Sequence, residues 1–280
     1  EIPTEMQAAV YRGINDIRLE RIPVPRISAH DILVKVAACG VCPTDIKKIQ
    51  YGTVPPPRVF GHETAGTIVK VGAHTRNFRV GDRVALHHHV PCRKCHACRH
   101  RAYAQCPQYK RTGITAGFEA AGGGYAQYVR VMSFCLPGVV KIPRRNTFAE
   151  GAMLEPVNTV LKAILRLNVL PGDVALVSGQ GPIGLMFTRL LALAKIRVIA
   201  TDLMPSRLRL AKKFGAILSA KPDHVSISKT IARLTGGRGL DAAIIAVPVD
   251  AAVKQASELL RGAGQLLLFA HTRRGAMSEV

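Results

Sequence analysis

The fold of the second half of the chain is decided by the stretch Val174-Ala-Leu-Val-Ser-Gly-Gln-Gly-Pro-Ile-Gly184. Its first five residues form an apolar run with the length and composition of a buried strand. The next six have the spacing Gly-x-Gly-x-x-Gly, and an apolar helical pattern follows over 183–194. Such a glycine string is weak evidence alone, but between a strand and a helix it predicts a dinucleotide-binding turn.

Each glycine has a separate task in a turn of this kind. Gly179 permits the tight turn, Gly181 lets the backbone approach a pyrophosphate, and Gly184 lets the helix lie close to the strand. Pro182 and Ile183 open the helix, whose unpaired N–H groups would face the phosphates. The alternative is a glycine turn with a purely structural role.

A carboxylate follows the next strand and indicates which dinucleotide binds. Asp202 comes directly after the apolar run 197–201, eighteen residues beyond Gly184. A carboxylate at this place accepts hydrogen bonds from the adenosine ribose and repels a 2′-phosphate, so the sequence favours NAD over NADP. Arg207 lies close by and would soften that preference. Asp202 could alternatively cap the next helix.

Helices and short apolar strands alternate from about residue 156 onward. The expected helices cover 157–168, 183–194, 206–214, 226–234 and 251–261, and the expected strands cover 174–178, 197–201, 240–247 and 265–270. Alternation of this kind predicts a parallel sheet with helices on both faces.

The first half instead reads as strands joined by irregular loops. β-rich runs at 6–11, 32–38, 66–71 and 125–131 are separated by Pro, Gly and Asn turns. We therefore predict an α/β protein with two domains: a barrel-like β unit over 1–155 and a nucleotide-binding unit over 156–280.

Four closely spaced cysteines form the clearest metal motif of the chain. They are separated by two, two and seven residues, within a basic lobe over 91–107: Cys92, Cys95, Cys98 and Cys106. Four such thiolates match a tetrahedral structural zinc site, which supplies folding energy on the order of 10 kcal/mol. The alternative is a pair of disulfides in a secreted protein, a class that the rest of the sequence does not suggest.

A second, weaker metal constellation lies earlier in the chain. Cys42, His62 and Glu63 offer a thiolate, an imidazole and a carboxylate, and Glu155 adds another carboxylate at the junction of the two halves. Such a set with an open position is typical of a catalytic zinc. Taken singly, Cys42 could be a core residue, His62 a loop histidine and Glu155 a helix-start carboxylate.

These motifs occur in an order that is specific in combination. Gly-Val-Cys-Pro-Thr-Asp at 40–45 is followed by Gly-His-Glu-x-x-Gly at 61–66, the cysteine lobe, Glu-Pro at 155–156 and the glycine turn. Over essentially its whole length the chain resembles the zinc-dependent medium-chain dehydrogenases, especially their sorbitol, polyol and secondary-alcohol branch. The resemblance implies a GroES-like catalytic domain followed by a Rossmann doubly wound parallel sheet.

The resemblance also implies two zinc ions per chain. The structural zinc would be held by the four cysteines of the lobe. The catalytic zinc would be held by Cys42, His62 and Glu63, with Glu155 as an alternating fourth ligand or as the partner of the bound water. Thr44 would hydrogen-bond the alcohol and pass its proton outward, while Asp45 would orient His62 by accepting its other N–H.

The implied reaction is hydride transfer from a secondary alcohol or polyol to NAD, which gives a ketone or an aldehyde. The residues expected to bind the cofactor are Gly179, Gly181, Pro182, Ile183, Gly184, Asp202 and Arg207. The outer proton path is open, because Lys47 and Lys48 stand where some relatives carry a relay histidine. The histidine tract 87–89 is not expected to bind metal.

The strong basic charge suggests anionic partners, but its distribution does not. Lys and Arg number 39 against 18 Asp and Glu, which gives a net charge of +21. These charges are scattered and lack interleaved aromatic residues, so we expect a solvated basic surface and no specific nucleic-acid partner. The longest apolar stretch, at 183–194, is too short to span a bilayer, and a cytoplasmic protein without membrane contact is expected.

Members of the family run longer than this chain, so the resemblance predicts a C-terminally incomplete nucleotide domain. The usual homo-oligomer is therefore doubtful, because the strand that pairs across the dimer would lie beyond Val280. Two other functions stay open. One is a truncated, weakly active or inactive homologue that acts as a basic, zinc-stapled binding protein. The other is a zinc-free quinone reductase, which would lack the set formed by Cys42, His62 and Glu63.

Overall fold

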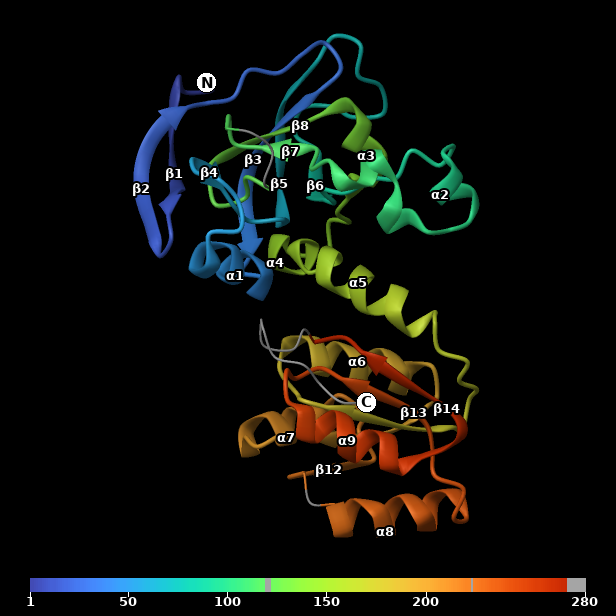
Figure 1. The fold of residues 1–280 in the computed structure, drawn as a ribbon. Coiled ribbons are helices and arrows are strands. Elements are labelled where there is room, and N and C mark those ends of the chain that lie inside the picture. Colours follow the sequence, from blue (N-terminus) through green and yellow to red (C-terminus); the bar gives the residue numbers. More distant parts are fainter. Residues whose placement is uncertain (119–121, 223, 271–280) are drawn as a thin grey trace. The chain divides into compact units, whose positions relative to one another are not determined.

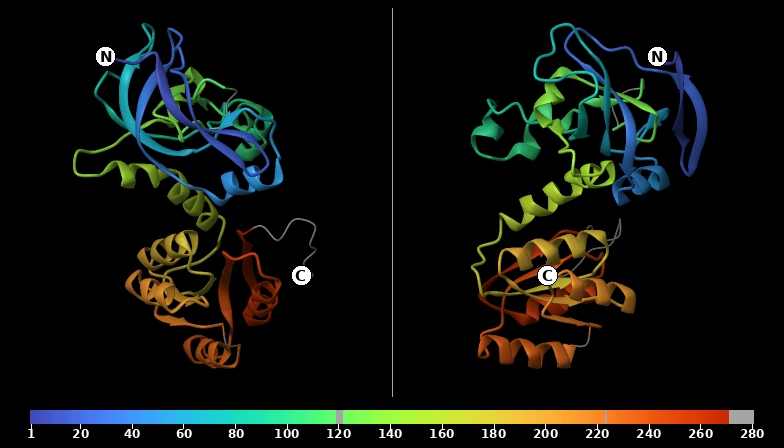
Figure 2. Two further views of the ribbon diagram at one scale, coloured as in Figure 1. Left: turned by 90° about the vertical axis from the view of Figure 1, so that its left-hand side faces the viewer. Right: turned by 180° about the vertical axis from the view of Figure 1, so that it is seen from behind.

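The computed structural model describes residues 1–118, 122–222 and 224–270. The chain divides into two compact units, Glu1–Glu155 and Pro156–Val280, which are drawn in Figures 1 and 2.

The first unit is built from two antiparallel sheets. A six-stranded sheet has the order β7-β8-β3-β5-β6-β9, and a three-stranded sheet has the order β2-β1-β4. The strands are β1 (Glu5–Gly13), β2 (Asp16–Pro23), β3 (Ile32–Gly40), β4 (Arg58–Val59), β5 (Glu63–Val71), β6 (Arg83–Leu86), β7 (Ile114–Thr115), β8 (Tyr128–Val131) and β9 (Val140–Lys141).

Strand β3 shows why this unit folds as it does. Ile32 and Val34 enter one buried cluster, while Leu33, which points the other way, enters a second. This alternation is the period of two that a strand buried on both faces requires. Each fully buried aliphatic side chain contributes about 1.5–3 kcal/mol, so an aliphatic core is sufficient without tryptophan.

Short helices fill the connections of the first unit. They are α1 (Pro43–Tyr51), α2 (His96–Arg99), η1 (Tyr103–Gln105), α3 (Pro107–Lys110), η2 (Ser133–Gly138) and α4 (Phe148–Ala152). In α4, Thr147 and Glu150 form a reciprocal capping box. Helix α4 contacts β3, β5 and β6, so the residues that follow it start beside the central strands.

The second unit contains a five-stranded parallel sheet with the order β12-β11-β10-β13-β14. Its strands are β10 (Val174–Ser178), β11 (Arg197–Thr201), β12 (Leu218–Ala220), β13 (Leu240–Ile245) and β14 (Leu260–Leu268). Its helices are α6 (Pro182–Leu193), α7 (Pro205–Lys213), α8 (His224–Thr235) and α9 (Asp250–Leu259), and α5 (Leu154–Ile164) leads into it.

Helices cover both faces of this sheet, as the sequence predicts. Val174 and Leu176 of β10 join a cluster with residues of α8 and α9. Ala175 and Val177, on the opposite face, join a cluster with residues of α5 and α6. The β-rich first unit and the parallel sheet covered by helices in the second unit agree with the α/β fold class predicted from the sequence.

Several elements differ from the sequence expectation: strand β12 and most of the short strands and helices of the first unit were not expected, and three further differences concern longer elements. Helix α1 was not expected, although it has Pro43 in its first turn and Gly52 with φ +59° after its end. Helix α5 begins three residues before the expected start at residue 157. Strand β14 begins at Leu260, five residues before the expected start at residue 265. It follows α9 directly, without a loop between them. No helix in the described part of the chain is both long and apolar enough to cross a membrane.

Candidate metal and nucleotide sites

Strand pairing brings the first metal constellation together. In the antiparallel pair β3·β5, Gly40 lies opposite Glu63. Cys42 follows two residues after Gly40, and His62 immediately precedes Glu63, so all three donor residues meet at one end of the pair. A Cβ at position 40 would collide with the Glu63 carboxylate, which explains the glycine there.

The donor atoms of Cys42, His62 and Glu63 all lie within 4.8 Å of one another. Cys42 is half-buried and is the extended residue that precedes α1. Burial would raise the pKa of its thiol, but hydrogen bonds from His62 and Thr44 outweigh burial and lower it. A lower pKa favours the thiolate, which is the form of cysteine that binds a metal ion.

Asp45 orients the histidine of this set. Its carboxylate is fully buried, and its Oδ2 lies 3.1 Å from His62 Nδ1, which leaves His62 Nε2 for a metal ion. Burial opposes a charge on His62, but Asp45 and Cys42 outweigh burial and raise the pKa of His62 to about 10. Tyr125 donates a hydrogen bond to the same Asp45 oxygen at 3.3 Å and, alternatively, to the Gly40 carbonyl at 3.3 Å. Sequence reasoning missed Tyr125.

The Glu155 carboxylate clusters with two histidines of the tract after β6 and not with Cys42, His62 and Glu63. Burial raises the pKa of Glu63, the charge of His62 opposes this effect, and the charge of Glu155 adds to it. The Glu155 carboxylate, however, falls within 4.8 Å of ligand atoms of His87 and His88. The expected role of Glu155 at the catalytic zinc stays a prediction.

Thr44, expected to pass the proton, and the two lysines at the open end of the proton path differ in exposure. Thr44 is exposed and hydrogen-bonds the Cys42 thiol. Lys47 is also exposed, whereas Lys48 is half-buried, with its Nζ 4.0 Å from Asp45 Oδ1.

The cysteine lobe places its four sulfur atoms in one cluster. All four Sγ atoms lie within 4.8 Å of one another, and all seven cysteines of the chain are free of disulfides. The backbone N–H groups of Cys92 and Cys95 point at sulfurs of the cluster, at 3.3 Å from Cys106 and 3.4 Å from Cys92. The Cys92 N–H lowers the pKa of the Cys106 thiol to about 6.

Both donor sets fit zinc by their chemistry. Four clustered sulfurs, two of which receive backbone N–H groups, form a closed set of four protein ligands, as structural zinc requires. The set of Cys42, His62 and Glu63 supplies only three ligands and therefore leaves a position for water or substrate.

The glycine turn has the geometry of a dinucleotide-binding turn. Gly179 has φ +91°, and a Cβ there would collide with Val247. A Cβ on Gly184 would collide with the Gly179 carbonyl, so the third glycine permits close contact between helix and strand. A Cβ on Gly181, by contrast, would meet no described atom within 4 Å. Pro182 occupies the first turn of α6, where its missing N–H costs nothing.

The Asp202 carboxylate stabilises the glycine turn by accepting hydrogen bonds from backbone N–H groups. Its Oδ2 accepts a hydrogen bond from the Gln180 backbone N–H at 2.7 Å, and its Oδ1 accepts one from Met204 N–H at 2.8 Å. Arg207 Nη1 lies 3.5 Å from the same carboxylate. Asp202 does not cap α7, because Met204 holds the N-cap position and has no side-chain cap.

A pocket of about 560 Å³ opens beside Asp202. Its walls combine the ends of β10 and β11 with the start of α9, and they include Gly179, Asp202, Arg207, Val247 and Gln255. The lining is largely apolar with one carboxylate and one guanidinium, which suits the base and ribose of a nucleotide.

Comparison with known proteins identifies the family. The profile of the alcohol dehydrogenase GroES-like domain matches residues 28–144, and that of the zinc-binding dehydrogenases matches residues 182–278. Sorbitol dehydrogenase of Bombyx mori is 35% identical over 277 residues, which cover 95% of this chain and 77% of that protein. Sorbitol dehydrogenase of Bacillus subtilis is 33% identical over 276 residues, covering 95% and 75%. The chain belongs to the zinc-dependent medium-chain dehydrogenases.

Solved structures of dehydrogenases have the same fold. A putative zinc-binding dehydrogenase from Sinorhizobium meliloti, bound to NADP, superposes with a TM-score of 0.85 at 27% identity and covers 99% of this chain and 80% of that one. The 2R,3R-butanediol dehydrogenase of Bacillus subtilis superposes with a TM-score of 0.83 at 29% identity, covering 98% and 80%. The family predicted from the sequence is therefore confirmed.

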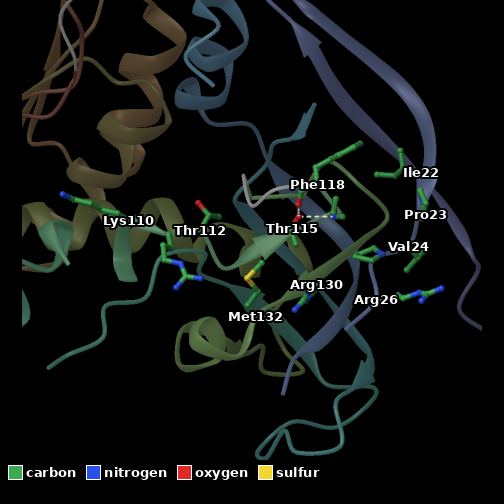
Figure 3. A pocket seen from close by; sticks show the side chains of 14 residues that line it. Ile22, Pro23, Val24, Arg26, Lys110, Thr112, Thr115, Phe118, Arg130 and Met132 are labelled. Atoms are coloured by element: carbon green, nitrogen blue, oxygen red, sulfur yellow. Dashed lines mark hydrogen bonds between the residues drawn. The ribbon is translucent and has the colours of Figure 1, made fainter. Parts of the chain in front are cut away.

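This family member has a further pocket that contains none of the predicted site residues. Figure 3 shows this pocket of about 810 Å³, lined by the segment after β2 and by residues around β7, including Arg26, Lys110, Thr115 and Arg130. Thr115 Oγ1 donates to the Phe118 carbonyl within it. Because it lacks metal donors and the glycine turn, we place the chemistry at the sets described above.

Proposed function

We propose that this chain is a zinc-dependent dehydrogenase that transfers a hydride from a secondary alcohol or polyol to NAD. The observation that carries the proposal is the convergence of Cys42, His62 and Glu63 within 4.8 Å, with His62 oriented by a buried carboxylate. The sorbitol and butanediol dehydrogenases among its relatives support this substrate class.

Cys42, His62 and Glu63 would hold a zinc ion, which would supply Lewis-acid chemistry that lowers the pKa of an alcohol hydroxyl. Asp45 keeps His62 in the tautomer that presents Nε2 to the ion, and Tyr125 supports Asp45 from the other side. Thr44 Oγ1 accepts the hydroxyl proton and, being exposed, passes it to solvent.

Bound NAD would supply the hydride acceptor for this oxidation, which would give a carbonyl compound, NADH and one proton released through Thr44. The protein supplies placement, and the hydride chemistry belongs to the cofactor. The glycine turn would receive the pyrophosphate at Gly181 and at the start of α6. The carboxylate of Asp202 favours NAD, because it would repel the 2′-phosphate of NADP.

The four-cysteine cluster would hold a second, structural zinc ion, so the proposed enzyme has two zinc ions per chain. A reducing cytoplasm is the compartment that suits seven free cysteines.

The appearance of NADH absorbance tests the function. Zinc-loaded protein should reduce NAD when offered a panel of polyols and secondary alcohols. Cys42→Ser should reduce turnover at least about 100-fold, which corresponds to about 2.7 kcal/mol of lost stabilisation. Cys135→Ser, at a buried thiol outside the metal sets, serves as the matched control and should keep activity. Turnover that survives Cys42→Ser would exclude the zinc mechanism, and DNA binding with a steep salt slope in a protein without turnover would favour the binding-protein alternative.

A further inference from the structure

The pocket of Figure 3 lies toward the end of the six-stranded sheet that is opposite the metal donors. In β3, Leu33 is paired with Arg130 of β8, and Gly40 is paired with Glu63 of β5. Arg130 lines the pocket, whereas Glu63 belongs to the metal set. The two positions are seven residues apart along β3, which is roughly 20 Å of strand, so this pocket is separate from the catalytic set.

The lining of this pocket is strongly cationic. Four basic side chains and no carboxylate of the described residues line it: Arg26, Lys110, Arg111 and Arg130. They come from the segment after β2, the end of α3 and strand β8. In the described part of the chain only Arg130 has a counter-charge, because its Nη2 lies 2.7 Å from Asp31 Oδ2. The pocket therefore keeps a net charge of +3 when Asp31 is included.

The surrounding sequence supplies no acidic residue that could neutralise this charge. Between residues 83 and 118 the chain contains seven Lys and Arg residues and no Asp or Glu. Cations that share a concave surface without counter-charges attract anions into it. The fold thus gathers at one pocket basic charges that look scattered along the sequence.

Two of these cations are held in place by uncharged partners. The Arg111 guanidinium lies over the Phe134 ring, 5.1 Å from its centroid, and Lys110 Nζ donates to Gln105 Oε1 at 3.0 Å. Neither partner neutralises a charge. A guanidinium has five N–H donors and an ammonium has three, so both side chains keep donors for a ligand.

Apolar side chains complete the lining, and Figure 3 shows them around the same hollow: Ile22, Pro23, Val24, Phe118 and Met132. The turn that carries Phe118 is fixed, because Thr115 Oγ1 donates to the Phe118 carbonyl and accepts from Gly117 N–H at 3.1 Å. The volume of about 810 Å³ lies in the range of small-molecule sites, about 300–1,000 Å³.

We propose that this pocket binds a small organic phosphate, with its phosphoryl group at Lys110 and Arg111 and its apolar body against the wall that contains Phe118. A phosphate monoester carries a charge of about −1.5 to −2 at neutral pH, which two adjacent cations match better than they match a single carboxylate. Guanidinium and ammonium groups both bind phosphate by charge-assisted hydrogen bonds. An apolar lining adds affinity for a ligand that has an apolar body.

Calorimetric titration of the full chain with phenyl phosphate tests the proposal. One equivalent should bind per chain. Inorganic phosphate lacks the apolar body and phenol lacks the charge, so each should bind at least about tenfold more weakly than phenyl phosphate.

Variants locate the binding of the probe. Arg111→Gln and Lys110→Gln should each weaken phenyl phosphate binding at least about tenfold, because each removes a charge-assisted hydrogen bond. Arg145→Gln is the matched control: it removes the same charge from an equally exposed position in the same unit, outside the pocket, and should leave the affinity unchanged. All three variants should keep the far-ultraviolet circular dichroism of the wild type.

Four results would overturn the proposal. The wild type does not bind phenyl phosphate, or it binds inorganic phosphate as tightly, which would exclude a role for the apolar wall. Arg145→Gln weakens binding as much as Arg111→Gln, which would indicate diffuse attraction to a basic surface. Arg207→Gln weakens binding while Arg111→Gln and Lys110→Gln do not, which would place the probe in the nucleotide pocket. The readout is ligand binding, so it is independent of whether the chain transfers hydride.

Discussion

Asp202 Oδ2 accepts a hydrogen bond from the Gln180 backbone N–H at 2.7 Å, so the carboxylate after β11 holds the glycine turn after β10. One side chain thus has two tasks: it fixes the shape of the turn, and it presents negative charge where the ribose of a nucleotide would bind. Asparagine removes the charge and keeps one acceptor oxygen for the Gln180 N–H, at the loss of the acceptor for the Met204 N–H.

We expect Asp202→Asn to raise the ratio of kcat/KM for NADP to that for NAD by about 10-fold to 100-fold, since like-charge repulsion of the 2′-phosphate is removed. Steady-state kinetics with both cofactors measures the ratio. Asp173→Asn is the control, because that carboxylate accepts a loop hydrogen bond from Leu170 N–H at 2.8 Å in the same unit and lies outside the pocket. An unchanged ratio in Asp202→Asn would assign cofactor choice to other residues.

The second and third glycines of the turn should respond differently to the same substitution. Gly184→Ala forces a Cβ into the Gly179 carbonyl, and overpacking of this kind lowers the free energy of unfolding by about 1–3 kcal/mol. Gly181→Ala places its Cβ in space free of described atoms, so the melting temperature without cofactor should be unchanged. Its affinity for NAD should nevertheless fall at least about tenfold, because the methyl group keeps the pyrophosphate away.

Thermal unfolding without nucleotide and calorimetric titration with NAD separate the two effects. Wild-type affinity for NAD in Gly181→Ala would show that the pyrophosphate does not approach this backbone.

The contact between Asp45 and His62 should control metal affinity. Asp45→Ala removes the acceptor that fixes the His62 ring, and loss of such a partner typically costs 10-fold to 100-fold in metal affinity or activity, so a decrease of about that size is expected. Tyr125→Phe removes one hydrogen bond to Asp45 and keeps the ring that lies against Gly61, so it should have a smaller effect. Competition for zinc with a chelator measures the zinc affinity of both variants. Equal effects of the two variants would mean that the Asp45 carboxylate orients the His62 ring only when the tyrosine hydroxyl holds it in place.

The parts of the site that the sequence could predict are those whose chemistry is local. The glycine turn lies in one strand–turn–helix stretch, and the four cysteines lie within fifteen residues, so their local spacing is enough to predict what each would bind. Asp45 was found because it lies three residues from Cys42 and belongs to the same motif.

Tyr125 and His88 could not be found in this way, because strand register brings them to His62 from distant segments. Tyr125 precedes β8, and His88 follows β6. The sequence shows the three consecutive histidines but does not show which of them is buried. The burial of His88 results from the folding of the sheet. Helix α1 had local signals, Pro43 and Gly52, which were outweighed by the β-rich pattern around them.

Asp31 should make the stability of the first unit depend on pH. Burial alone would raise the pKa of this carboxyl, but hydrogen bonds from Ser28 and the Arg130 guanidinium outweigh burial and lower it. Arg130 Nη2 lies 2.7 Å from Asp31 Oδ2, and Ser133 N–H donates to Oδ1 at 3.0 Å. Because the pKa is lower in the folded state, the unfolded state binds the proton more tightly. The resulting stability is fully present above the unfolded pKa, near 4, and is lost as pH falls through the folded pKa.

Asp31→Asn should therefore lower the free energy of unfolding by about 2–4 kcal/mol at neutral pH, since it leaves the partly buried Arg130 without its counter-charge. The difference from wild type should shrink below about pH 4, because the wild-type carboxyl then takes up a proton as well. Urea titrations followed by circular dichroism at several pH values measure this difference in the free energy of unfolding. Asp16→Asn, at an exposed pair with Arg18, should change little at any pH. A difference between Asp31→Asn and wild type that stays constant down to pH 2 would show that hydrogen bonding, and not charge, makes this carboxylate stabilising.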